Sequence, residues 1–362
     1  MNRDQSENRV FVLGAGASRA VKSQAPLNDE LLYKILERHQ QFRVNKLREF
    51  VSDFYNISYR GRRWQDSLPA IEDVLSQLDF SLSEKRPLSS VFSLPYLQVV
   101  RDQLISGICK LLRTNLDNKE GLDKVYRFMR MLSDRDAIIS LNYDLVVDSA
   151  ICRCRNSPQY VDYDIPIRQA INRQEETFAY KPNSPFKVFK LHGSLNWLYC
   201  PHCQTIDVTM EEDGTINYIA SYGADQLRCC PYCQVPFESV IVAPTFLKTY
   251  NNTYISQLWR NAELALSKAS EIIFIGYSMP DADIVLRCMF KRAYYSGSTH
   301  GDMRHSRITV IDYVDPKKKG QGSYVNYTRK RFEKLFREVV YDDTGFECYI
   351  DHGCQTVAQS IS

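Results

Sequence analysis

A short apolar run that ends in a glycine-rich turn sets the strongest constraint on how this chain folds. The segment from Arg9 to Ser18 reads Arg-Val-Phe-Val-Leu-Gly-Ala-Gly-Ala-Ser. Val10 to Leu13 have the continuous apolar character of a buried parallel strand. Small residues directly after such a strand let the backbone of a following helix approach a phosphate. A Gly-x-Gly alone also fits a tight turn that binds nothing, so its meaning depends on the rest of the chain.

The composition is that of an ordinary soluble globular protein and argues against several other classes. The chain has 362 residues and a net charge of +3, which is too small to indicate nucleic acid as the main partner. No apolar run has the length of a membrane span, and the polar start, Met1 to Asn8, lacks the core of a signal peptide. Eleven cysteines without a secretion signal favour metal ligands and free thiols, so we expect a cytoplasmic protein.

Five further apolar runs are predicted strands, and they are followed by polar or small residues. They span Ala137–Leu141, Phe186–Leu191, Ser239–Val242, Glu271–Ile275 and Ile308–Ile311. The residues that follow them are Asn142-Tyr143-Asp144, His192-Gly193-Ser194, Ala243-Pro244-Thr245, Gly276-Tyr277-Ser278 and Asp312. Because ligands of open α/β sheets bind at the carboxyl ends of the strands, candidates for a site beside the glycine turn are Asn142, Asp144, His192, Gly276, Ser278 and Asp312.

Each candidate also has a structural interpretation. Asn142 could cap a helix that begins near Asp144. A histidine at a strand end, such as His192, more often makes a structural hydrogen bond than takes part in catalysis. Asp312 could hold a ribose hydroxyl or could belong to a turn. The sheet edge that His192 shares with Asn142 and the glycine turn favours the functional interpretation.

Helical periodicity fills much of the region between the first two predicted strands. Asn28 is expected to cap a first helix, and three apolar stripes follow between Pro69 and Leu132. The stripes are Ile71, Val74, Leu75 and Leu78; Leu97, Val100, Leu104, Ile108 and Leu111; and Leu122, Val125, Met129 and Leu132. We therefore expect a helical insertion beside the sheet. Farther along, the polar segment from Tyr160 to Pro185 is predicted to be a long loop.

Two Cys-x-x-Cys pairs indicate a metal site. The first is Cys200-Pro-His-Cys203 and the second is Cys230-Pro-Tyr-Cys233, and two such pairs close a tetrahedral site. Four cysteines leave no open coordination position, so Zn²⁺ bound there would be structural. Cys229 and His202 are further candidates for a ligand position. The acidic character of the segment between the pairs argues against nucleic-acid contact.

The order of these motifs along the chain resembles that of the sirtuin family. It runs from Gly14-Ala15-Gly16-Ala17-Ser18 through Asn142-Tyr143-Asp144, His192-Gly193-Ser194 and the cysteine pairs to Gly276-Tyr277-Ser278 and Asp312. The resemblance implies an α/β fold: a doubly wound, Rossmann-like parallel sheet that binds NAD, a helical insertion and a small four-cysteine zinc module. One sirtuin-like catalytic domain would span 1–362, with its core at 9–60, 133–199 and 234–350, the insertion at 61–132 and the zinc module at 200–233.

The resemblance also implies roles for single residues. His192 would be the catalytic base, and Asn142 would orient a water molecule or a ribose hydroxyl. Asp144 would lie with Asn142 near the nicotinamide ribose. The other NAD-binding residues would line the pyrophosphate (Gly14, Ala15, Gly16 and Ser18) and the adenosine side (Gly276, Ser278 and Asp312). The structural Zn²⁺ would be bound by Cys200, Cys203, Cys230 and Cys233.

Departures from the family pattern favour NAD hydrolysis over protein deacylation. Deacylating sirtuins follow the glycine turn with Gly-Ile-Pro-Asp-Phe-Arg-Gly, where this chain has Arg19 to Leu27, and carry Gln where it has Leu141. They also carry a Phe-Gly-Glu segment after the zinc module, where this chain has Val242 to Phe246. The stretch from Gly276 to Asp283 resembles divergent bacterial sirtuin-like proteins that hydrolyse NAD, commonly in antiphage defence.

The resemblance therefore implies an NAD⁺ glycohydrolase that releases nicotinamide and ADP-ribose. An NAD-dependent protein deacylase is the alternative, and a non-catalytic NAD or ADP-ribose sensor is a third. An unchecked NAD hydrolase would poison its own cell, so we expect a gated homo-oligomer and a partner such as an ATPase or helicase encoded nearby. We expect neither membrane association nor direct nucleic-acid binding.

Overall fold

A six-stranded parallel sheet forms the centre of the protein. The computed structural model describes residues 8–60, 63–116, 120–154, 161–171, 175–177, 187–208, 229–241, 253–281, 283–296, 305–319 and 326–352. The strands are β1 (Arg9–Leu13), β2 (Ala137–Ser140), β5 (Lys187–Lys190), β9 (Glu271–Ile275), β10 (Arg307–Ile311) and β11 (Val340–Asp342). Their spatial order is β11-β10-β9-β1-β2-β5, and every neighbouring pair is parallel. This is the strand order of a doubly wound Rossmann-like sheet, so the predicted fold class is confirmed.

The register of the sheet brings the ends of its strands to one edge. Leu13 at the end of β1 pairs with Ser140 of β2 and with Ile275 of β9. Ser140 in turn pairs with Lys190 of β5, and Ile275 pairs with Ile311 of β10. The residues that follow these strand ends therefore lie along the same edge, as the sequence predicted. The strand order reverses between β1 and β9, which is where ligands of such sheets bind.

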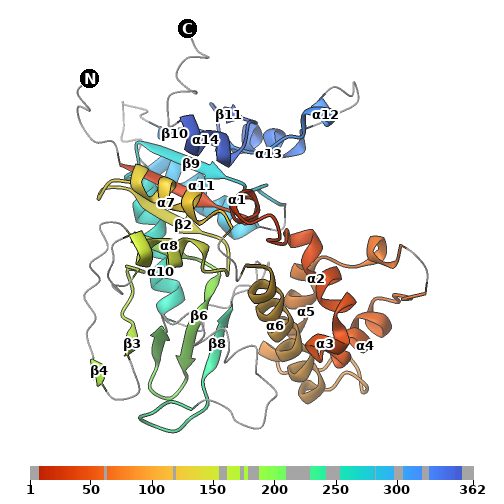
Figure 1. Ribbon diagram of the computed structural model, residues 1–362. Coiled ribbons are helices and arrows are strands. Elements are labelled where there is room, and N and C mark those ends of the chain that lie inside the picture. The colour runs from red at the N-terminus through yellow and green to blue at the C-terminus, as the bar shows by residue number, and fades with distance from the viewer. Residues whose placement is uncertain are drawn as a thin grey trace, which may run out of the picture.

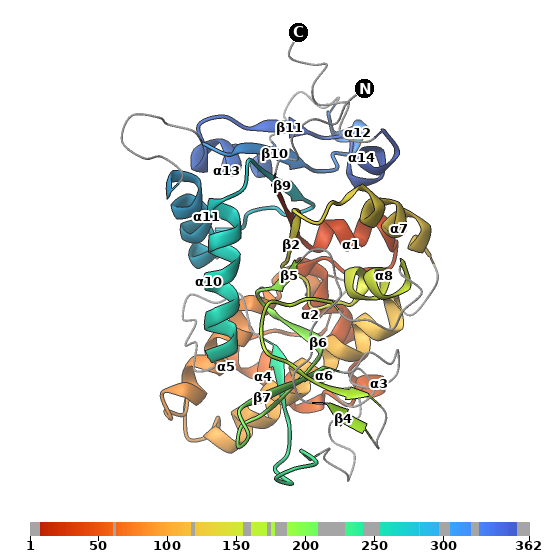
Figure 2. The same cartoon turned by 90° about the vertical axis from the view of Figure 1, so that its left-hand side faces the viewer.

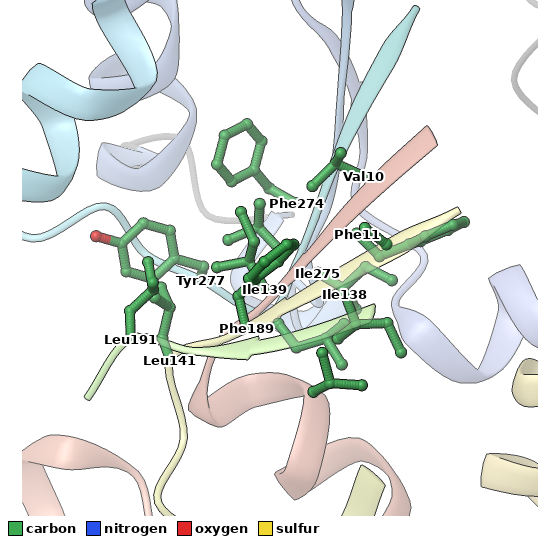
Figure 3. Packing of buried hydrophobic residues seen from close by; sticks show 14 of the residues in the cluster. Val10, Phe11, Ile138, Ile139, Leu141, Phe189, Leu191, Phe274, Ile275 and Tyr277 are labelled. Carbon is green, nitrogen blue, oxygen red and sulfur yellow. The ribbon is translucent and has the colours of Figure 1, made fainter. Parts of the chain in front are cut away.

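Helices cover both faces of this sheet (Figure 2). On one face lie α1 (Ala15–Val21), α7 (Leu122–Met131), α8 (Val146–Cys154) and α14 (Phe346–His352); on the other lie α10 (Thr253–Ser267), α11 (Ile284–Ser296) and α13 (Tyr327–Leu335), and α12 (Pro316–Lys319) follows β10. Aromatic contacts hold helices against each of the two faces of the sheet. Phe11 of β1 meets the edge of Phe128 of α7 at 5.3 Å between ring centroids, and Phe274 of β9 meets Phe290 of α11 at 5.1 Å. Figure 3 shows this core, with Leu141, Leu191 and Tyr277 at the same end of the strands.

A second hydrophobic cluster is formed mainly by helices that lie to one side of the parallel sheet (Figure 1). It contains α2 (Asn28–Glu37), α3 (His39–Phe42), α4 (Asn45–Phe54), α5 (Ile71–Ser83) and α6 (Leu94–Leu116), with the 3-10 turn η1 (Trp64–Ser67) at its margin. We call these helices the helical module. Residues of a second sheet, among them Leu195, Leu198 and Ile241, pack into the same cluster. Within the described residues, no helix combines the length and the apolar character needed to cross a membrane.

The sequence predicts only part of the second sheet. Its strands are β3 (Arg168–Ile171), β4 (Glu175–Thr177), β6 (Gly193–Cys200), β7 (Thr205–Val208) and β8 (Glu238–Ile241), in the order β4-β3-β7-β6-β8. The loop predicted from Tyr160 to Pro185 is wrong where β3 and β4 lie, because main-chain pairing of β3 with β7 and of β4 with β3 makes strands of a polar segment. The strand predicted at Ser239–Val242 is β8, which pairs with β6 and not with the parallel sheet. Residues 178–186 and 242–250 lie outside the described residues.

The division of the chain into core, insertion and zinc module stays a prediction. The packing groups the helices somewhat differently from the predicted bounds of 61–132. The second cluster begins at Leu31, well before residue 61. Helix α7, near the other bound, packs against α8 and α14 on the face of the parallel sheet.

Two glycine turns touch at the point where the strand order reverses. The Gly16 amide donates to the Gly276 carbonyl at 2.9 Å. A Cβ on Gly14 would lie 2.5 Å from that carbonyl oxygen, and a Cβ on Gly276 would lie 2.3 Å from the Ala17 nitrogen. Gly276 also has a φ of +58°, which favours glycine. Only glycines let the ends of β1 and β9 approach this closely.

We predict that Gly276→Ala lowers the free energy of unfolding by at least about 2 kcal/mol, because left-handed strain and overlap with the α1 backbone add. Thermal or urea unfolding measures the loss. Gly345→Ala is the matched control: Gly345 also has a positive φ, but its nearest foreign atom is a Tyr313 side-chain carbon at 3.3 Å. Equal losses in the two variants would contradict the importance of the turn-to-turn contact.

Candidate functional site

Two cavities lie at the carboxyl edge of the parallel sheet and share Ala15, Asn28 and Tyr277 in their walls. The inner cavity has a volume of about 70 Å³, and its walls include Gly14, Ser18, Asn142, Asp144 and His192. The outer cleft has a volume of about 1150 Å³, and its walls include Gly16, Gly276, Ser278 and Asp312. The structure therefore brings all ten residues predicted to be catalytic or NAD-binding to two adjoining cavities.

Asn142 ties the end of β2 to the glycine turn. Its Nδ2 donates to the Gly14 carbonyl at 2.9 Å and to Ser18 Oγ at 3.0 Å. Ser18 Oγ donates onward to Asp144 Oδ2 at 2.7 Å. The amide hydrogens of Asn142 are thus engaged by the turn, which leaves its Oδ1 as the atom that can accept a hydrogen bond from a ligand. The hydroxyl hydrogen of Ser18 is likewise engaged, so Ser18 positions the turn.

Asp144, and not Asn142, caps the following helix. Its Oδ1 accepts from the Val146 amide at 3.1 Å at the start of α8, so the alternative interpretation of Asn142 as the cap is wrong. Burial raises the pKa of Asp144, while the nearby Lys190 ammonium and the Ser18 and Val146 donors act in the opposite direction. Lys190 Nζ also donates to the Asp144 carbonyl oxygen. Asp144 is therefore held on every side before any ligand arrives.

A buried polar network holds the segment around Asp144 in place. Lys190 and Asp148 form an ion pair at 3.1 Å, and the Lys190 side chain has no exposed surface. Tyr163 donates its hydroxyl to Asp148, and Asn196 Nδ2 donates to the Tyr163 oxygen at 3.2 Å. Because an unpaired buried charge is costly, this network fixes β5, α8 and β6 relative to one another.

His192 is buried and has a defined tautomer. Its Nδ1 lies 3.0 Å from the Leu141 carbonyl oxygen, which can only accept, so Nδ1 carries the proton. In the neutral imidazole the lone pair is then at Nε2. Trp259 Nε1 donates to the Leu191 carbonyl at 3.0 Å and holds the strand end that carries the histidine. The arrangement gives a 4% exposed imidazole, in the wall of the inner cavity, that can accept a proton.

The outer cleft has polar groups of both signs. Asp312 accepts from the Tyr341 hydroxyl at 2.6 Å through Oδ2 and from the Tyr313 amide at 2.9 Å through Oδ1. Arg331 donates to the Ser278 carbonyl at 3.3 Å, and Arg19 and Lys124 lie in the same walls. The Gly16 amide is bound to the Gly276 carbonyl, so Gly16 contributes close packing at this point.

The four cysteines predicted as zinc ligands come together. Their Sγ atoms all lie within 4.8 Å of one another, with Cys200 to Cys233 at 3.4 Å and Cys203 to Cys230 at 3.7 Å. Tetrahedral zinc with Zn–S bonds of about 2.3 Å requires sulfur atoms about 3.8 Å apart, so the donors fit the ion. Neither Cys229 nor His202 is in this cluster, although both are among the described residues. The four cysteines can therefore hold a structural Zn²⁺.

A model of the SIR2-like domain matches residues 136–320, slightly more than half of the chain. The chain belongs to the SIR2-like domain family. The matched part contains Asn142, His192 and the cysteine cluster, and the resemblance to sirtuins predicted from the order of the motifs is confirmed.

Solved sirtuin structures are similar to this SIR2-like chain at low sequence identity. One, Sir2Tm bound to a propionylated peptide, is 14% identical with a TM-score of 0.42, and the match covers 99% of this chain and 96% of that chain. Another, a complex of a Sir2 homologue with NAD, is 13% identical with a TM-score of 0.43, over 99% and 92% of the two chains. No curated protein sequence matches the chain significantly.

Sequence reasoning missed several residues in the inner cavity of this SIR2-like domain. They are Asn28, Glu72, Tyr143, Tyr277 and Asp283. The expected role of Asn28 as a cap is wrong: its Nδ2 donates to Glu72 Oε1 at 3.0 Å, and Leu27 takes the cap position of α2. Tyr277 and Asp283 belong to a stretch that the sequence singled out, so they could have been found there. Glu72 carries no such signal, because it sits in an ordinary amphipathic helix.

We predict one zinc ion per chain, and we expect Cys200→Ser to lose it and to lower the unfolding temperature, because metal binding is coupled to folding. Metal analysis of the purified protein and thermal melts measure both effects. Cys229→Ser is the matched control, since Cys229 precedes Cys230 but lies outside the cluster, and it should keep the metal. A well-folded wild-type protein without zinc would refute the site.

Proposed function

We propose that this chain cleaves the nicotinamide–ribose bond of NAD⁺ and transfers the ADP-ribosyl group to water. The observation that carries the proposal is the buried His192, held through Nδ1 in the tautomer whose Nε2 can accept a proton, in the wall of the same cavity as Asn142 and the glycine turn. Family membership supports NAD as the substrate. The size of the outer cleft suits the adenosine and pyrophosphate part, and the small inner cavity lies where the reacting ribose would be placed.

The reaction has a simple balance of bonds. The bond between the ribose C1′ and the pyridinium nitrogen breaks, and its electron pair neutralises the nitrogen of the departing nicotinamide. Positive charge spreads over the ribose, as in other glycosidic cleavages. A water oxygen bonds to C1′, and His192 Nε2 accepts the proton that this water loses. Asn142, through Oδ1, would orient the water or a ribose hydroxyl.

Protein deacylation is the alternative reaction that the experiment below distinguishes from hydrolysis. Support for water as the acceptor comes from the sequence, where Arg19 to Leu27 and Leu141 replace residues typical of deacylating sirtuins. The segment Val242 to Phe246, expected to differ from the peptide-docking segment, lies outside the described residues.

The decisive experiment incubates the purified chain with NAD⁺ alone and with NAD⁺ plus acetylated peptides. We expect nicotinamide and ADP-ribose in equal amounts without peptide, and no matching loss of acetyl groups when peptide is present. Chromatography of the nucleotides and mass spectrometry of the peptides measure both. Nicotinamide release that depends on peptide and matches deacetylation would replace hydrolysis with deacylation.

We predict that His192→Ala lowers nicotinamide release by about 10²–10⁴-fold, the usual cost of losing a general base, while the protein still folds and binds NAD⁺. His202→Ala is the control, because His202 is exposed and outside both cavities. Asn142→Ala should also reduce turnover strongly, and the double variant should be little worse than either single variant. A stable His192→Ala protein with wild-type turnover per molecule would remove His192 from the mechanism.

The wider role that we propose is NAD depletion in antiphage defence, by a gated homo-oligomer with a partner protein. A hydrolase that consumes NAD needs such a gate, because the cofactor is shared by the whole cell. Phage plating on cells that carry the wild type or His192→Ala, together with cellular NAD measurements, tests this role. Protection that survives the loss of turnover would contradict it.

A further inference from the structure

Three carboxyl side chains surround the inner cavity. Besides Asp144, they are Glu72 in the first turn of α5 and Asp283 just before α11. No lysine or arginine is among the described residues that line this cavity, whereas the outer cleft has side chains of both signs: the basic Arg19, Lys124 and Arg331 and the acidic Asp29, Glu120, Asp312 and Glu347. The cavity is therefore acidic where the proposed chemistry occurs, and basic side chains lie only in the adjoining cleft.

Glu72 and Asp283 are both held by neutral hydrogen-bond donors. Asn28 Nδ2 donates to Glu72 Oε1 at 3.0 Å, and the Tyr277 hydroxyl donates to Asp283 Oδ2 at 2.7 Å. Burial, with the adjacent Asp283 carboxylate, raises the pKa of Tyr277 well above its usual value, so this hydroxyl stays a donor. Donors of this kind orient carboxylates without cancelling their charge.

In the absence of ligand, ionising the Glu72 carboxyl group costs free energy. Burial raises the pKa of Glu72, and the nearby Asp283 carboxylate raises it further, against the Asn28 hydrogen bond. A positive charge placed in the cavity would favour the ionised form of Glu72 and would relieve the repulsion from Asp283. The cavity thus fits a cation better than a neutral group.

Oxidised NAD is cationic at its nicotinamide end, where the pyridinium ring carries a positive charge. A molecule lying with this end in the inner cavity places the ring among carboxylates with no basic side chain in the walls. Its phosphates would lie in the outer cleft, whose walls include Arg19, Lys124 and Arg331. During cleavage the positive charge moves from the pyridinium nitrogen to the ribose, so it stays within reach of the acidic walls.

We propose that Glu72, supplied by the helical module, is a further catalytic residue whose carboxylate, paired with Asp283, holds the cationic end of NAD⁺ and stabilises the charge that develops on the ribose. This rests on the proposed function. The proton transfer of the reaction is unchanged: the leaving nitrogen takes the electron pair, and His192 takes the proton of the water. Glu72 forms no covalent bond to the substrate and contributes through a fixed charge.

The first measurement is turnover of Glu72→Gln. Glutamine keeps the shape of the side chain and can still accept the Asn28 hydrogen bond, so the fold should survive. We expect nicotinamide release at saturating NAD⁺ to fall by about 10²-fold, the order found when a charge-stabilising group is removed. Asp73→Asn is the matched control, because it removes one carboxylate from the next residue of α5, which is exposed and outside the cavity. The control should keep wild-type turnover.

The second measurement separates charge from structure. In a His192→Ala background, which is expected to slow turnover by about 10²–10⁴-fold, calorimetry compares the affinities for NAD⁺ and for NADH, whose dihydronicotinamide ring is neutral. We expect Glu72→Gln to reduce the preference for NAD⁺ by at least about tenfold, and Asp283→Asn to reduce it as well. A merely structural role would weaken both ligands equally.

An unchanged NAD⁺-to-NADH preference in both variants, or wild-type turnover of folded Glu72→Gln, would overturn the proposal. If thermal melts show that Glu72→Gln does not fold, the Asp283→Asn preference decides. Absence of nicotinamide release by the wild-type chain would refute the proposed function by itself, since the affinity ratio is measured independently of turnover.

Discussion

The contact between the glycine turns after β1 and β9 is the constraint on which the site depends. The Gly16 amide binds the Gly276 carbonyl, and neither turn has room for a Cβ. The contact occurs where the strand order reverses, so it sets the separation of the two halves of the sheet at the point where a ligand enters. The inner cavity and the outer cleft lie against this same contact, and their shapes follow from it.

A directional chain of hydrogen bonds then converts this fixed turn into a fixed site. Asn142 donates to Gly14 and to Ser18, and Ser18 donates to Asp144. Because each donor is used once, the orientation of every group in the chain follows from that of its neighbour. These hydrogen bonds also limit which atoms of the site can contact a ligand. Asn142 can offer a ligand its carbonyl oxygen, and His192, whose Nδ1 is bound to the Leu141 carbonyl, can offer its Nε2.

The parts of this arrangement that the sequence predicts are those with strong local signals. The parallel strands are continuous apolar runs, and the parallel register makes their following residues neighbours, so the positions of Asn142 and His192 could be inferred. The two Cys-x-x-Cys pairs are also a local sequence signal, and they predict the metal site. By contrast, β6 has no alternating pattern, because almost all of its residues are buried. The hydrogen bond between Asn28 and Glu72 joins residues 44 positions apart and has no sequence signature.

The inner cavity lies between two hydrophobic cores, and it is smaller than the part of NAD that would enter it. A volume of about 70 Å³ holds a few water molecules, so a ribose with its nicotinamide enters only if a wall moves. The sheet wall is tied by the turn contact and by the hydrogen-bond chain. The opposite wall comes from the helical module, through Leu31, Glu72, Leu75, Ile108 and Leu112, and most of these side chains belong to the second cluster. If NAD⁺ enters as proposed, the wall that has to move is therefore the one from the helical module, and Glu72 moves with it. In the proposed mechanism, the entry of substrate and the carboxylate that faces its cationic end are then coupled through the same group of helices.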